Sequence, residues 1–187
     1  MEPIVLIKSV SEVLKIAAEA MSKVGDSLAH LTRIGVQGYD ALAARRAHSQ
    51  LSGLRVSLGI LYGASNIRIV RSIDEYIDLA RSSRLDDASR QWNAVVHLLT
   101  ETTTRVEDLL TEVNKIRNDF VLEEAYSTIQ RSLYGRLSLF EKLKALPAPL
   151  AGDTLEALAH VAAEYRRLME ATDNASEQLA AYIKTIK

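Results

Sequence analysis

The fold is decided by residues 7–42, which read IKSVSEVLKIAAEAMSKVGDSLAHLTRIGVQGYDAL. Small or apolar residues recur in this stretch at alternating intervals of three and four. Because an α-helix turns once every 3.6 residues, that spacing places them in one stripe along a helix. The stripe consists of Ile7, Val10, Leu14, Ala17, Met21, Val24, Leu28, Leu31, Gly35, Gly38 and Leu42.

Two later stretches repeat the same spacing. The second stripe consists of Leu85, Ala88, Trp92, Val95, Leu99, Thr102, Val106, Leu109, Val113, Ile116 and Phe120. The third consists of Leu155, Leu158, Ala162, Tyr165, Met169, Thr172, Ser176, Leu179, Ile183 and Ile186. Stripes of this length predict helices of roughly 25–35 residues, or about 40–50 Å. We therefore expect an all-α fold, an elongated antiparallel bundle of about five long helices with coiled-coil-like packing.

The length and composition fit one helical domain. A chain of 187 residues is expected to form a single domain over 1–187. Its clearest linker is the proline-containing stretch before the last helix, at 147–153. Because only 5% of the residues are aromatic, the core must consist mainly of Leu, Ile, Val and Ala.

The composition also excludes several classes of protein. There is no cysteine, which excludes disulfide scaffolds, cysteine-bound zinc, iron–sulfur clusters and thiol nucleophiles. The N-terminus lacks the basic lead-in of a signal peptide, and no run of 18 apolar residues occurs. We expect no transmembrane helix and a cytoplasmic location.

The helix boundaries are less clear than the stripes. Helix one is expected to begin near Ser9 or Ser11, either of which could cap it. It breaks or kinks either in the glycine-containing stretch 35–38 or in 43–50, where the stripe loses its phase. The last helix is expected to be capped by Asp153 or Thr154.

The next helix, expected over 51–81, differs from the others in segment 51–73. One face of this segment carries leucines and a second carries Val56, Ile60, Gly63, Ile67 and Val70. A helix with two apolar faces is either central in a bundle or contacts something apolar. Whether the segment is buried or exposed stays open, as does a break at Gly63, after which Ser65 or Asn66 could cap a new helix.

Charge is distributed unevenly, although the net charge is only −1. Residues 33–73 contain six arginines and one acid, Asp40, whereas residues 100–128 contain seven acids and three bases. Two interpretations follow. Neighbouring helices carry complementary charge, or the arginine-rich stretch forms a basic face for an anionic partner.

No pattern indicates catalysis or metal binding. None of the four histidines follows a Glu at the Glu-x-x-His spacing of helical di-iron proteins. His30, His97 and His160 each stand four residues from a carboxylate, but on the face opposite the stripe, where we expect solvated polar pairs. Nucleophile elbows, His-Glu-x-x-His and phosphate loops do not occur. We expect no enzyme, catalytic residue, metal, cofactor or small-molecule substrate.

The sequence is best interpreted as a non-enzymatic interaction protein: an adaptor, inhibitor or scaffold that presents a helix face to a protein partner. Self-association is also compatible with long striped helices. Nucleic acid is not expected, because the pI is about 6.4 and no helix-turn-helix is present. The alternative is a membrane-acting bundle that exposes the basic apolar segment 51–73 to anionic bilayers. The candidate partner-binding residues are Arg55, Gly59, Tyr62, Gly63, Arg68 and Arg71.

Overall fold

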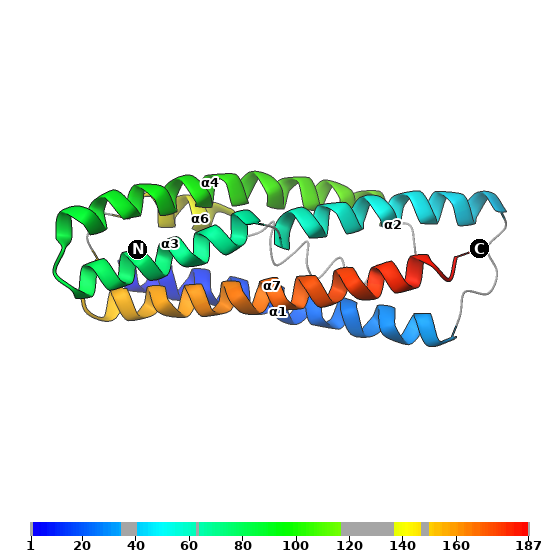
Figure 1. Cartoon of the computed structure of the whole chain (residues 1–187), viewed down its shortest axis with the longest axis horizontal. Coiled ribbons are helices and arrows are strands. Elements are labelled where there is room, and N and C mark those ends of the chain that lie inside the picture. The colour runs from blue at the N-terminus through cyan, green and yellow to red at the C-terminus, as the bar shows by residue number, and fades with distance from the viewer. Residues whose placement is uncertain (1, 35–40, 63, 117–136, 147–149, 187) are drawn as a thin grey trace.

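The computed structural model describes residues 2–34, 41–62, 64–116, 137–146 and 150–186, and within these ranges it is helical without a strand. The helices are α1 (Pro3–Ile34), α2 (Ala41–Tyr62), α3 (Ala64–Arg81), α4 (Leu85–Ile116), α6 (Leu137–Lys144) and α7 (Asp153–Ile183). They lie along one long axis and form an elongated bundle (Figure 1). The predicted all-α bundle is confirmed, while its coiled-coil-like packing stays a prediction.

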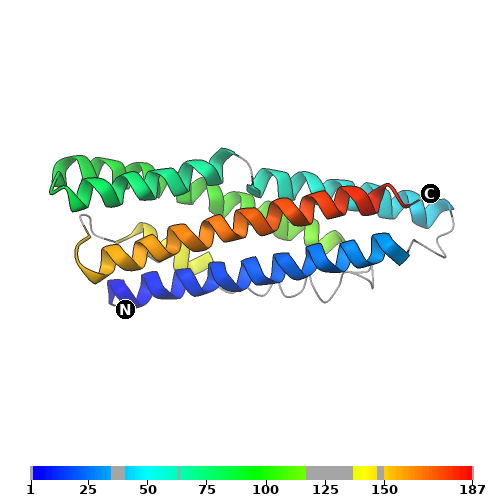
Figure 2. The ribbon, with the colours of Figure 1, turned by 60° about the horizontal axis from the view of Figure 1, so that its bottom comes forward.

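The described long helices run in both directions along the bundle, as Figures 1 and 2 show. α1 and α4 run one way, and α2 and α3, which lie between them in the chain, run the other way. α7 runs in the same direction as α1. These two, α1 and α7, also form the most extensive pair among the described helices. The antiparallel expectation therefore holds for α2 and α3 against α1 and α4, but not for the α1–α7 pair. The predicted number of about five helices stays a prediction.

The core follows the predicted stripes. On α1 the stripe residues from Ile7 to Leu28 are all 1% exposed or less. On α7 the stripe is buried from Leu155 to Ile183, apart from the partly exposed Met169 and Ser176. Aliphatic residues and alanine make up most of the core, which allows the helices to approach closely.

Two helix starts, those of α1 and α7, differ from the expectations. α1 begins at Pro3, not near Ser9 or Ser11, because proline is favourable at the first position of a helix. Ser9 lies inside α1, where its hydroxyl donates to the carbonyl of Val5. α7 begins at Asp153 after Gly152, which has a positive φ of 55° and makes no side-chain cap, so neither Asp153 nor Thr154 is the N-cap.

The stretch 43–50 contains no break, because it is helical throughout and belongs to α2. The stripe only looked interrupted there, since the buried positions are occupied by the small residues Ala44 and Ala47 ahead of Leu51. The other predicted place, 35–38, lies outside the described residues, between the end of α1 and the start of α2.

The single helix expected over 51–81 is in fact two helices, α2 and α3. They are separated at Gly63, where a break had been left open, and Gly63 itself lies outside the described residues. α3 begins at Ala64, so neither Ser65 nor Asn66 precedes it as a cap. Residues 82–84 form the turn between α3 and α4, with Ser83 at a positive φ of 57°. Phe120, the last residue of the second predicted stripe, also lies outside the described residues.

Candidate interaction groove

A groove of about 620 Å³ runs between α2 and the C-terminal part of α7. Residues three or four apart line it on each helix, so each helix contributes one continuous face. The lining residues are His48, Ser52, Arg55, Val56 and Gly59 of α2, and Ser176, Ala180, Ile183 and Lys184 of α7 and its end. We call this the α2–α7 groove.

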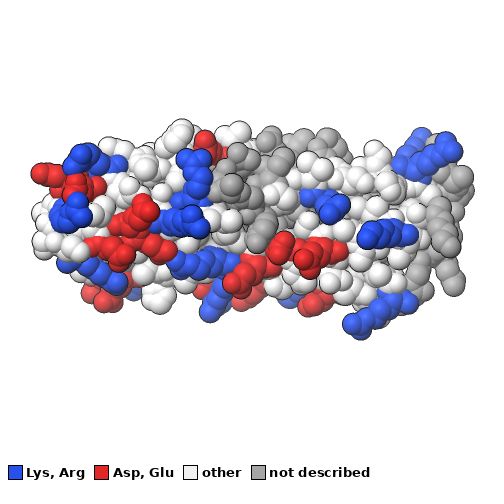
Figure 3. Space-filling model, viewed as in Figure 1, with Lys and Arg blue, Asp and Glu red and all other residues white. Residues whose placement is uncertain are grey.

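The α2–α7 groove is basic. Its charged lining residues are Arg55 and Lys184, joined by His48 when that imidazole is protonated, and all three are exposed. Among the described residues that line it there is no Asp or Glu. Figure 3 shows the same imbalance on a larger scale, because the visible surface toward the start of α2 carries blue groups and no red one among the described atoms.

The cations of the groove have no partner within the described part of the chain. Ion pairs join Arg166 to Asp74 and Arg84 to Asp87, and others lie within α4, α6 and α7. None involves α2, whose sequence contains no acid, or Lys184. The acids of 100–128 other than Glu101 have side chains outside the described residues, so complementary charge between neighbouring helices stays a prediction.

The apolar wall of the groove is only partly open. Val56 is 63% exposed, the highest value among the large hydrophobic residues described as exposed. Gly59 contributes no side chain, and a Cβ placed on it would find no atom within 4 Å. On the facing helix, Ala180 is partly exposed, while Ile183 is buried. The basic groups therefore stand beside an apolar surface that is open at Val56 and Gly59.

The predicted partner-binding residues are only partly brought together. Arg55 and Gly59 line the α2–α7 groove. Arg68 and Arg71 are exposed, but they belong to α3 and do not line it. Tyr62 ends α2, with its side chain outside the description, and Gly63 lies outside the described residues altogether.

Sequence reasoning missed the contribution of α7. Ser176 and Ile183 belong to the third stripe, whereas Lys184 is not among the candidate partner-binding residues. Nothing in the local sequence reports that the end of α7 packs beside α2, because that contact depends on chain direction and register. The one available signal was the shortage of acids around Arg55.

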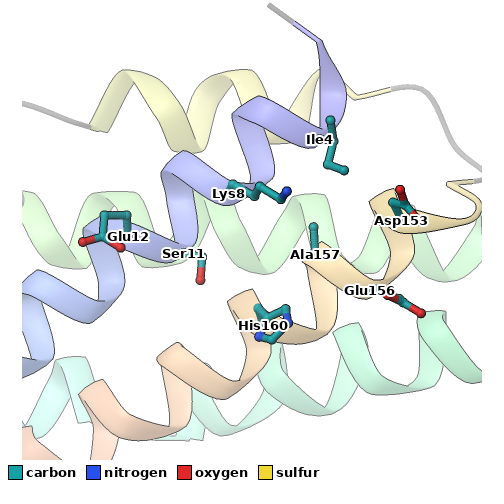
Figure 4. Close-up of a pocket in the computed structure, with 8 residues that line it drawn as sticks. All are labelled: Ile4, Lys8, Ser11, Glu12, Asp153, Glu156, Ala157 and His160. Carbon is teal, nitrogen blue, oxygen red and sulfur yellow. The ribbon is translucent and has the colours of Figure 1, made fainter.

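Two further grooves follow the α1–α7 pair, and both have mixed charge. The first, about 570 Å³, contains Lys8 and His160 together with Glu12, Asp153 and Glu156 (Figure 4). Its acids Asp153 and Glu156 stand in the first turn of α7, where the helix dipole favours them. The second, about 390 Å³, has basic residues Lys15 and Arg167 and acidic residues Glu19, Glu164 and Glu170.

The groove in Figure 4 also contains the residue types of a serine hydrolase, with Ser11 and His160 beside carboxylates. A working set would need the serine hydrogen-bonded to the histidine and the histidine oriented by an acid. Neither hydrogen bond is formed between these described residues. His160 is exposed to water, so the arrangement indicates no nucleophile.

The described ranges also bear on two other kinds of site, those for a metal ion and those for a membrane. There, no three His, Asp or Glu side chains are grouped so as to hold a metal ion. The described helices include none that combines the length and apolarity required to cross a bilayer. No protein-family model, curated protein or solved structure matches the chain.

Proposed function

We propose that this protein is a non-enzymatic helical interaction protein, an adaptor, inhibitor or scaffold, that binds a protein partner in the α2–α7 groove. The observation that carries the proposal is the pair of exposed cations, Arg55 and Lys184, which flank an apolar wall and have no ionic partner in the described structure. Cations arranged this way favour encounter with an anionic surface and add specificity more than raw affinity.

The rest of the bundle supports a scaffold role. Its long helices share one continuous core, so α2 and α7 are held on a rigid frame. Each of the two other grooves contains acids as well as bases, so the charges within one groove can compensate each other. Only the α2–α7 groove, among the three described, offers uncompensated charge of one sign.

The experiment is cross-linking of the full chain in native lysate, with cross-linked peptides mapped by mass spectrometry. We expect one partner to cross-link near α2 and the end of α7, and Arg55→Glu to reduce its recovery. Arg81→Glu is the matched control, because Arg81 is exposed, makes no ion pair in the described structure and lies outside the groove. Equal recovery with both variants would contradict the proposal.

The membrane alternative requires α2 to rearrange, so experiments can distinguish it from binding of a protein partner. Leu51, Leu54 and Leu58 are fully buried, so α2 would have to leave the bundle to insert them into a bilayer. Each such side chain stabilises the bundle by about 1.5–3 kcal/mol through burial. Among the described large hydrophobic residues of segment 51–73, Val56 and Ile67 are exposed, and each stands next to an arginine in the sequence. Sedimentation with anionic liposomes and dye leakage, unaffected by excess protein partner, would support the membrane alternative instead.

A further inference from the structure

We infer that the occupant of the α2–α7 groove is an acidic amphipathic helix that packs small or short apolar residues against Gly59 and Ala180. This inference rests on the proposed function and specifies the chemistry of the partner. Two neighbouring helices that border a partly apolar groove offer a surface that suits a third helix, a common mode of peptide recognition. A bilayer is flat and cannot fill such a groove without rearrangement.

The length of the groove fits a short helix. Its lining residues on α2 extend from His48 to Gly59, or about 16 Å at 1.5 Å per residue. On α7 they extend from Ser176 to Lys184, or about 12 Å. A helix of about three turns therefore covers the site, with apolar contacts repeating every three or four residues.

The position of the cations specifies where the acids of the partner belong. Arg55 comes from α2 and Lys184 from the end of α7, so the two helices that form the groove each contribute a positive group. An occupant helix with Glu or Asp on both flanks of its apolar stripe satisfies both cations at once. Basic flanks would be repelled from both sides.

The small residues set the shape of the occupant. Gly59 leaves open space where a side chain would stand, and Ala180 is the small lining residue that α7 contributes. Such small residues allow close approach of a backbone. Filling this position should therefore prevent docking, while leaving the charge of the groove unchanged.

The test uses the full chain and a synthetic probe. The probe is a fluorescein-labelled, alanine-rich helix of about 18 residues, long enough to be helical in water, with a Leu/Ala stripe flanked by Glu. One control peptide replaces each Glu by Lys, and another keeps the composition but scrambles the stripe. Binding is measured by fluorescence anisotropy at low and physiological salt.

We expect the Glu probe alone to bind saturably, and its Kd to rise with salt, because screening weakens exposed ion pairs. Arg55→Glu or Lys184→Glu should each raise the Kd of the probe by about fivefold, which is the upper end for the loss of one exposed ion pair. Arg81→Glu should leave Kd unchanged. Gly59→Phe should abolish binding although it removes no charge, with thermal unfolding confirming that this variant is folded.

The contradicting results are equally specific. Equal binding of the scrambled peptide, or full binding to Gly59→Phe, would show only nonspecific attraction to a polyanion and overturn the inference. No binding of the Glu probe would also overturn it.

If a native partner cross-links near α2 in an Arg55-dependent way but the Glu probe does not compete for it, the proposed function stands and the helical occupant is wrong. If the probe binds as expected but no native partner depends on Arg55, the groove chemistry stands and the proposed function fails.

Discussion

The backbone N–H of Leu150 donates a hydrogen bond to the phenolic oxygen of Tyr76, with 2.5 Å between the two atoms. Tyr76 is fully buried on α3, and Leu150 lies just ahead of α7. The ring of Tyr76 also packs against Trp92 of α4, with centroids 5.0 Å apart and planes tilted by 51°. The side chain of Tyr76 therefore holds the segment just ahead of α7 against α3 and α4.

Replacing Tyr76 by Phe should destabilise the fold by about 1–3 kcal/mol, because the buried N–H of Leu150 loses its acceptor. Urea unfolding followed by fluorescence of Trp92, the single tryptophan, measures the change. Thr172→Val is the control: this fully buried hydroxyl donates only to the carbonyl of Leu168 in its own helix, so its removal should change stability by less than about 1 kcal/mol. Equal costs would contradict the assigned role of Tyr76.

Stability should fall at alkaline pH. Burial raises the pKa of Tyr76 above its ordinary value of 10.0, against a smaller opposing effect of the Leu150 hydrogen bond, and burial also raises the pKa of Tyr165. Because the folded state holds these phenols protonated, their contribution is complete below pH 10 and is lost as pH rises toward the folded values. Urea midpoints between pH 8 and 11 should decrease, and less steeply in Tyr76→Phe. A flat profile would be inconsistent with buried phenols.

Asp87 should contribute in the opposite pH range. A hydrogen bond from Arg84, reinforced by the positive charges of Arg84 and Arg90, lowers the pKa of Asp87 below its ordinary value of 3.8. Its contribution is therefore present above pH 3.8 and is lost as pH falls through the lower folded value. Asp87→Asn should be slightly less stable than the parent chain at neutral pH. Their thermal midpoints should converge under strongly acidic conditions, and a constant difference would contradict this.

Two glycines should respond differently to substitution. Gly59→Ala meets open space and should gain about 0.5–1 kcal/mol from reduced chain entropy in a helix. Gly25 is buried where α1 meets α7. An added Cβ lies 2.9 Å from the side-chain nitrogen Nδ2 of Asn174 and 3.6 Å from Cα of Ala175.

Asn174 is exposed and can turn aside for Gly25→Ala, so that change should be nearly neutral. A leucine at position 25 must displace the backbone of α7, at a cost of about 1–3 kcal/mol. Thermal unfolding of the three variants tests the order Gly59→Ala, Gly25→Ala, Gly25→Leu from most to least stable. A tolerated Gly25→Leu would show that α1 and α7 are not closely apposed there.

Much of the architecture is readable from spacing alone. The stripe from Ile7 to Leu28 is buried as predicted, because burial on a helix requires only a repeat near 3.6 residues. The helix boundaries were harder to place. Pro3 starts α1 ahead of the first stripe residue, and Ala44 and Ala47 carry the buried face of α2 without large side chains, so the apolar stripe by itself marked neither boundary.

The candidate site likewise combines features that the sequence shows with features that only the fold shows. The sequence by itself determined that the chain forms long amphipathic helices and that Arg55 and Gly59 lie in an acid-poor, glycine-containing stretch, since periodicity and charge are local properties. Only the tertiary structure decided that Lys184, Ala180 and Ile183 face that stretch across a groove, and that Arg68 and Arg71 do not. Those outcomes depend on the directions in which the helices run and on the separation of α2 from α3, which place residues more than a hundred positions apart in one groove.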